Sequence, residues 1–249
     1  MAYFYYENIK VYYERRGSGH PLLLLHGNTT STKLFKSDIP FFSQYFDVIS
    51  FDYPGHGLSD YMEHFREDFW YFNSLVAIEL LNHLKIDETY IIGTSGGALV
   101  ALNIATQQPE LAPLIIADSF FGNRLSSKEA EKIVKSRQKA KSDFMNIQYW
   151  KQFNPNTWEH IVDEDCRVLL AIGQKKLPLI YGDLSKIKSE VLLVGTSTDD
   201  VIPDIPNRLS ELAEIIPNSD LKLYDYGRHT FMITEKEEFR RIALDFLEL

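Results

Sequence analysis

Short apolar runs alternate with longer amphipathic stretches over most of this chain. Residues 3–6 and 9–16 are predicted to form two antiparallel strands. Further strands are predicted at 21–27, 46–57, 89–95, 113–119, 190–197 and 221–227, and the apolar runs at 21–27 and 46–57 are typical of strands covered on both faces. Amphipathic segments predict helices at 33–45, 66–85, 95–108 and 206–216. This alternation predicts an α/β fold, in which a mostly parallel sheet carries helices on both sides.

Residues 120–186 interrupt the alternation, because they contain helical patterns but no convincing strand. Ser126 and Glu129 have the spacing of a capping box at the start of one of these helices. The segment follows one strand of the sheet and precedes the next, so it is expected above the carboxyl edge, where open α/β folds bind ligands. We therefore predict a core made of residues 1–119 and 187–249, with 120–186 inserted as a helical cap, or lid.

A last helix is predicted at the C-terminal end. Thr234 and Glu237 have capping-box spacing, which predicts that Thr234 is the N-cap. The apolar residues that follow share one helical face, namely Phe239, Ile242, Ala243, Phe246 and Leu247. That face is expected to pack against the sheet.

Composition narrows the classes of function. The chain has 249 residues, 45% of them hydrophobic, and 26 basic against 35 acidic residues give a net charge of −9. This charge disfavours binding to nucleic acids and anionic membranes. Cys166 is the single cysteine, so no intrachain disulfide or cysteine-based metal cluster is expected. With neither a signal-peptide pattern nor an apolar run of bilayer length, we expect a cytoplasmic protein that acts on a small molecule.

Candidate chemistry centres on Ser95. Residues 93–97 read G-T-S-G-G, which matches G-x-S-x-G, with a predicted strand directly before and a predicted helix directly after. In such a nucleophile elbow the serine occupies a strained turn, and side chains two positions away on either side would collide. Gly93 and Gly97 remove those side chains. The elbow would expose the Ser95 hydroxyl at the positive end of a helix.

A serine hydroxyl needs a base, and the base needs an acid to orient it. His229 follows a predicted strand, and Asp199 follows an earlier one. Ser, Asp and His therefore occur in the order expected of the nucleophile-elbow architecture. Asp200, which is adjacent, and Asp118, which ends an earlier predicted strand, are alternative acids.

An oxyanion hole is expected beside Ser95. The apolar run at 21–27 ends in His-Gly-Asn, and the backbone N–H of Asn28 is one expected donor, with the Gly96 N–H as the second. His26 is interpreted as a residue that packs and braces this turn rather than as a base. No motif for a metal, phosphate or dinucleotide occurs, so no metal and no cofactor is expected.

Five motifs in order resemble the α/β-hydrolase fold family over nearly the whole chain apart from 120–186: HGN at 26–28, FDYPGHGLSD at 51–60, GTSGG at 93–97, GTSTDDVIP at 195–203 and GRH at 227–229. The resemblance implies a three-layer fold with an eight-stranded sheet and a helical cap. It also implies that Ser95 is the nucleophile, that His229 is the base and then the acid, and that Asp199 is its partner. Relatives usually place this acid four residues before a proline such as Pro203, which favours Asp199 over its alternatives.

Three functions follow from this pattern. The first is a serine hydrolase that cleaves a small, largely apolar carboxylic ester or thioester through an acyl-enzyme. The second uses the same residues for C–C bond hydrolysis, a lyase step or perhydrolysis. The third is a receptor that keeps the fold without turnover.

Two weaker features lie in the predicted cap. Residues 124–141 carry seven basic and two acidic residues, which could steer anionic substrates but are interpreted chiefly as a solvated helix face. Large aromatic residues could line an apolar pocket, although packing of the cap explains most of them: Phe120, Phe121, Phe144, Trp150 and Trp158.

Overall fold

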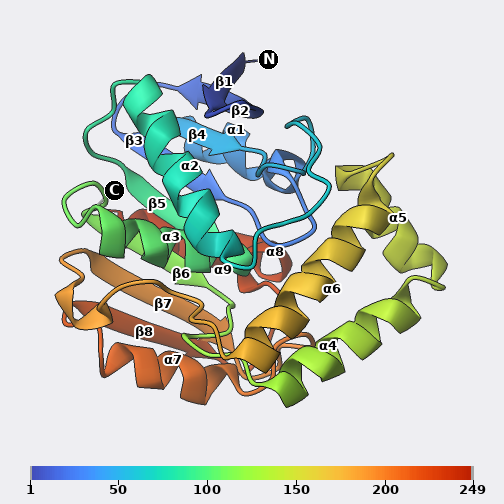
Figure 1. Ribbon diagram of the computed structural model, residues 1–249. Coiled ribbons are helices and arrows are strands. Elements are labelled where there is room, and N and C mark those ends of the chain that lie inside the picture. The colour runs from blue at the N-terminus through green and yellow to red at the C-terminus, as the bar shows by residue number, and fades with distance from the viewer. Residues whose placement is uncertain (1, 248–249) are drawn as a thin grey trace.

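A twisted sheet of eight strands runs through the molecule, which is described here by a computed structural model covering residues 2–247 (Figure 1). The strand order is β1-β2-β4-β3-β5-β6-β7-β8. β2 pairs antiparallel with β1 and β4, and every later pairing is parallel. The strands are β1 (Ala2–Tyr6), β2 (Ile9–Gly17), β3 (Pro21–Leu25), β4 (Asp47–Phe51), β5 (Tyr90–Thr94), β6 (Leu114–Asp118), β7 (Glu190–Thr196) and β8 (Ser219–Tyr224). The predicted mostly parallel sheet is confirmed.

Helices cover both faces of this sheet, as the apolar runs predicted. Successive residues of a strand point to opposite faces, so Leu23 packs in one apolar cluster and Leu24 in the other. The first cluster includes residues of α2, α3 and α7, and the second includes residues of α1 and α9. The helices outside residues 127–175 are η1 (Thr32–Phe35), α1 (Asp38–Phe42), α2 (Phe69–His83), α3 (Gly96–Gln107), η2 (Leu184–Lys186), α7 (Ile205–Ala213), α8 (Phe231–Thr234) and α9 (Lys236–Phe246).

Three helices fill most of the segment between β6 and β7. They are α4 (Ser127–Ala140), α5 (Phe144–Phe153) and α6 (Trp158–Lys175), and residues 120–186 contain no strand. The predicted capping box opens α4, where Ser126 Oγ accepts from the Glu129 N–H and the Glu129 carboxylate accepts from the Ser126 N–H. In Figure 1 these helices lie beside the sheet rather than on either face of it. We call residues 120–186 the helical insertion.

Two helical predictions need correction. The stretch 33–45 is broken into η1 and α1, because Pro40 has no N–H and is tolerated only in the first turn of a helix. The last helix, α9, begins at Lys236, and Thr234 is not its N-cap. Instead, Thr234 Oγ1 accepts from the Arg228 N–H at 3.0 Å and donates to the Arg228 carbonyl at 3.3 Å. Thr234 therefore braces the loop that carries His229, while the predicted apolar face of α9 packs on the sheet.

Candidate active site

Ser95 occupies a sharp turn between β5 and α3. Its backbone has φ +54° and ψ −122°, a conformation that residues with side chains rarely adopt and that is stabilised here by the surrounding structure. The Ser95 N–H donates to the carbonyl of Asp118 on the neighbouring strand at 2.8 Å. The turn separates Ser95 from both regular elements and places its side chain in the wall of a cavity.

Glycines make this turn possible by leaving out side chains. A Cβ on Gly93 would meet the backbone of Gly97, and a Cβ on Gly97 would meet the carbonyl of Leu25 on β3. Both positions therefore require glycine, as the elbow motif predicted. A Cβ on Gly27 would lie 3.1 Å from Ser95 Cβ, so the loop after β3 runs directly against the serine.

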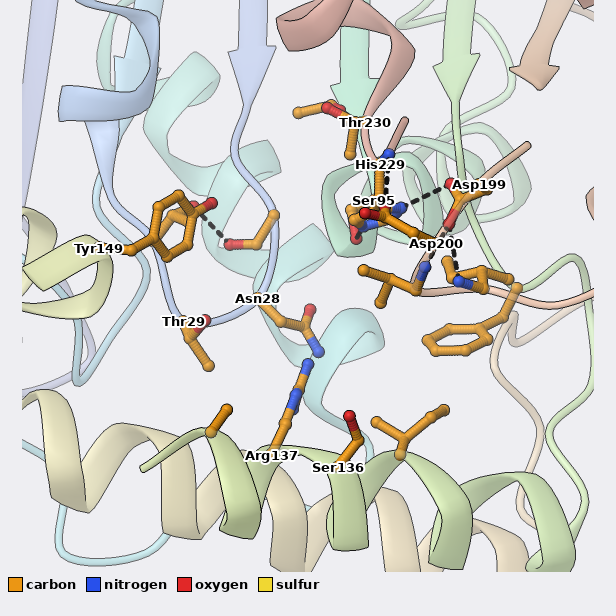
Figure 2. Close-up of a pocket in the computed structure, with 18 of the residues that line it drawn as sticks. Asn28, Thr29, Ser95, Ser136, Arg137, Tyr149, Asp199, Asp200, His229 and Thr230 are labelled. Atoms are coloured by element: carbon orange, nitrogen blue, oxygen red, sulfur yellow. Dashed lines mark hydrogen bonds and ion pairs between the residues drawn. The ribbon is translucent and has the colours of Figure 1, made fainter. Parts of the chain in front are cut away.

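The three residues predicted from chain order lie together at the carboxyl ends of their strands (Figure 2). Ser95 Oγ is 3.0 Å from His229 Nε2, and His229 Nδ1 is 2.8 Å from Asp199 Oδ2. The second oxygen of Asp199 accepts from the backbone N–H groups of Val201 and Ile202 at 2.9 and 2.7 Å. The Asp199 side chain is only 1% exposed, so this carboxylate is held in one orientation toward the imidazole.

Neither alternative acid contacts the ring of His229. Asp200 is exposed and accepts from the His229 backbone N–H at 3.2 Å. Asp118 is fully buried and accepts from Thr94 Oγ1 at 2.8 Å, from Ser119 Oγ at 2.7 Å and from the Met232 N–H at 3.1 Å. Burial raises the pKa of Asp118 to about 6. Asp118 thus connects the nucleophile turn to the segment after His229.

His26 begins the loop that follows β3 and runs against Ser95. Its ring stacks on Tyr53 with centroids 3.9 Å apart, and Nε2 accepts from the Tyr53 N–H at 3.2 Å. Burial lowers the pKa of His26 to about 3, so the ring stays neutral at physiological pH. His26 braces the turn, in line with its interpretation from the sequence.

The two backbone donors expected for an oxyanion flank Ser95. Gly96 is the first residue of α3, and Asn28 follows Gly27 in the adjacent loop. Among residues 2–247, neither the Asn28 N–H nor the Gly96 N–H has a hydrogen-bond partner. Unpaired N–H groups at a helix start favour negative charge beside them.

The Asn28 side chain joins the core to the helical insertion, a link that sequence reasoning missed. Trp70 Nε1 donates to Asn28 Oδ1 at 3.0 Å, and Asn28 Nδ2 donates to Asp165 Oδ1 of α6 at 2.6 Å. The signal that could have revealed it is the position of Asp165 within an apolar stripe that includes Ile161 and Leu169. An acidic residue in such a stripe is buried and needs a partner.

The cavity beside Ser95 has a volume of about 560 Å³ and is lined by both the core and the insertion. Of the predicted aromatic residues, Phe121 and Trp150 line it, whereas Phe144 is 69% exposed. Of the basic residues, Lys132 and Arg137 line it. The expected solvated face is formed by other members of the basic stretch, including Lys128, Lys135 and Lys139, which are exposed.

Arg137 departs from the predicted solvated face because it belongs to the inner stripe of α4, four residues after the buried Ile133. Its Nη1 forms an ion pair with Asp165 Oδ2, and burial lowers the pKa of its guanidinium. Figure 2 shows Arg137 rising from α4 toward Asn28. Arg137 and Asn28 therefore share the Asp165 carboxylate at one wall of the cavity.

Two other classes of feature are absent from residues 2–247. No group of three or more His, Cys, Asp or Glu side chains in this range is arranged to hold a metal ion. No helix in this range is both long enough and apolar enough to cross a membrane.

Comparison with known proteins relates this chain to α/β hydrolases. A family model described as alpha/beta hydrolase fold matches residues 20–157. The chain is 25% identical over 268 residues to (E)-2-((N-methylformamido)methylene)succinate hydrolase of Acinetobacter baylyi, covering 97% of this chain and 95% of that protein. It is 24% identical over 291 residues to a proline iminopeptidase of Clostridioides difficile, covering 99% and 97%. A structure from work on carboxylesterases of Nitrososphaera gargenis superposes with a TM-score of 0.81 at 20% identity, covering 99% and 97%.

Proposed function

This chain belongs to the α/β hydrolase fold family, and on that premise we propose that it is a serine hydrolase that cleaves a small carboxylic ester or thioester. The observation that carries the proposal is the continuous chain of hydrogen bonds from Ser95 through His229 to Asp199. A serine, a base and a buried acid in this order are the parts that acyl transfer requires.

The reaction proceeds in two halves. His229 Nε2 takes the Ser95 hydroxyl proton as Oγ attacks the carbonyl carbon, and Asp199 stabilises the resulting imidazolium. The tetrahedral intermediate collapses when His229 returns the proton to the leaving alcohol or thiol, which leaves an acyl group on Ser95. His229 then deprotonates a water that attacks this acyl group, and the free acid is released as Ser95 regains its proton.

The negative charge of each tetrahedral intermediate develops on the former carbonyl oxygen. We assign the backbone N–H groups of Asn28 and Gly96 to this oxygen, because both flank Ser95 and lack other partners among residues 2–247. One such donor contributes about 3 to 4 kcal/mol to transition-state stabilisation in enzymes where it has been removed. The helical insertion, residues 120–186, acts as the cap that limits the size of the acyl group.

Substitution of two serines that line the same cavity tests the proposal. Ser95→Ala is expected to lower kcat for p-nitrophenyl acetate and butyrate by at least about 10⁴-fold. Ser136→Ala is the matched control, since Ser136 lines the cavity from α4, and its activity should stay near that of the unaltered protein. Equal activity of Ser95→Ala and the unaltered protein would contradict the assignment.

A second candidate reaction is hydrolysis of a C–N bond. It is favoured by the relative named as a proline iminopeptidase, whose name implies cleavage of a peptide bond. The same residues would act, with an amine in place of the alcohol as leaving group. Prolyl p-nitroanilide and simple carbamates, measured alongside the esters, distinguish the two: faster turnover of the C–N substrates would assign the protein to this second class.

A further inference from the structure

Part of the hydrogen-bonding capacity of Arg137 is unused. The Arg137 side chain is 18% exposed and lines the cavity that contains Ser95. Its Nη1 is engaged by Asp165, and the guanidinium also forms a hydrogen bond with the Cys166 thiol. Among residues 2–247, no oxygen accepts a hydrogen bond from Arg137 Nε or Nη2. A guanidinium has five donors in a planar fork, so donors remain for a ligand.

Charges around this part of the cavity favour an anion. α4 contributes Lys132 and Arg137 to the lining, and Asp165 offsets one of these two positive charges. Glu129 also lines the cavity, but its carboxylate forms an ion pair with Arg208. One positive charge is therefore left at the α4 wall of a protein whose net charge is −9. This balance matches a ligand group with a single negative charge.

The wall of the cavity beside His229 carries negative rather than positive charge. Asp200 lines the cavity beside His229 and is exposed, with no basic side chain among residues 2–247 paired to it. An anionic group is repelled there and attracted at α4. A ligand with one anionic end would thus be oriented across the cavity, with its neutral part toward Ser95.

We propose that Arg137, with Lys132 lining the same cavity, binds a carboxylate of the substrate, so that the preferred substrates are esters carrying one free carboxylate. The inference rests on the proposed function and makes its substrate class more specific. A carboxylate suits this site because the planar guanidinium can donate two parallel hydrogen bonds to it. Arg137 is a specificity residue here, while Ser95 and His229 carry out the bond cleavage.

Two matched pairs of esters test the proposal. Monomethyl glutarate and methyl pentanoate differ in a carboxylate at the end of the acyl part, and 4-acetoxybutanoate and butyl acetate differ in the same way in the alcohol part. We expect kcat/KM to favour the anionic member of at least one pair by about 10- to 100-fold, mainly through KM, the range expected for a charged hydrogen bond. The readout is the ratio of kcat/KM within each pair.

Arg137→Gln should abolish this ratio while leaving turnover of the neutral esters within a few-fold. Because Asp165 is 5% exposed and would lose its charged partner, the double variant Arg137→Gln/Asp165→Asn is measured as well. An asparagine oxygen at 165 can still accept from Asn28. Lys139→Gln is the control, since it removes the same charge from an exposed position of α4 outside the cavity.

The outcomes separate the two proposals. A ratio that favours the anionic ester and is lost in both Arg137 variants, but kept in Lys139→Gln, supports the carboxylate site. A ratio near or below one in both pairs, or a preference that survives removal of Arg137, overturns it while ester hydrolysis by Ser95 still stands. Hydrolysis that does not depend on Ser95 overturns the proposed function itself.

Discussion

Gly96→Ala should disturb the nucleophile turn chiefly through the side chain of Asn28. A Cβ at position 96 would overlap Asn28 Oδ1, and it would lie 2.9 Å from Asn28 Cγ and 2.8 Å from Trp70 Nε1. The Gly96 backbone is helical rather than left-handed, so alanine is tolerated by the backbone itself. The side chain of Asn28 must therefore move away from its present partners.

The loss of stability in Gly96→Ala follows from the two hydrogen bonds that the Asn28 side chain makes. Its bond from Trp70 joins neutral groups and contributes about 1 kcal/mol, whereas its bond to the Asp165 carboxylate contributes about 1.5–3 kcal/mol. Losing both lowers the free energy of unfolding by about 2.5–4 kcal/mol. A shift of the Asn28 backbone would also misplace one proposed oxyanion donor and lower kcat by about 10²–10³-fold.

Urea unfolding of a double-mutant cycle measures this coupling. Asn28→Ala removes the overlapping amide, so Gly96→Ala should lower the free energy of unfolding by about 2.5–4 kcal/mol in the unaltered protein and by clearly less in the Asn28→Ala background, where only the contact with Trp70 Nε1 remains. Ester hydrolysis is measured on the same four proteins. If Gly96→Ala were equally destabilising in both backgrounds, the explanation through Asn28 would be refuted.

Three further predictions concern buried or paired titratable groups. Asp199→Asn should lower kcat by about 10⁴-fold, as seen in enzymes where the equivalent acid is replaced, whereas Asp200→Asn should change kcat only a few-fold. Similar losses in both variants would contradict the assignment of Asp199 as the acid. Asp118→Ala leaves the Met232 N–H buried without a partner, so it should lower the free energy of unfolding measured in urea by about 1–3 kcal/mol. An unchanged urea midpoint would contradict this. Burial lowers the pKa values of His26 and His56 to about 3 and about 4, and it raises that of Asp118 to about 6. Near pH 5 the unfolded chain then binds about one more proton than the folded chain, because the two histidines outweigh Asp118, so stability should fall by about 1.4 kcal/mol per unit as pH drops. Urea midpoints that stay level or increase toward pH 5 would contradict this sign.

The fold and the residues around Ser95 were predictable because they depend on local patterns. Apolar runs identify strands buried on both faces, and Gly93 and Gly97 mark a turn whose backbone leaves no room for side chains. Once strands are parallel, their carboxyl ends meet at one edge, so the order of Ser95, Asp199 and His229 was enough to expect them near one another.

Contacts between distant segments were not predictable in the same way. The Asn28–Asp165 hydrogen bond joins positions 137 residues apart, and the sequence around either residue does not identify the other as its partner. Arg137 was grouped with a solvated face because its charge suggested exposure, although its position in the stripe of Ile133 indicated the interior. Thr234 has a capping-box spacing, but its hydroxyl bonds to Arg228, a tertiary contact that overrides the local pattern.

Labelling with a fluorophosphonate tests the central claim most directly, because this reagent reacts with a serine only when a neighbouring base has activated it. Intact-mass analysis and peptide mapping should show one adduct, on Ser95, with strongly slower labelling in His229→Ala and none in Ser95→Ala. A folded protein that remains unlabelled, or one labelled equally well after Ser95→Ala, would contradict the account.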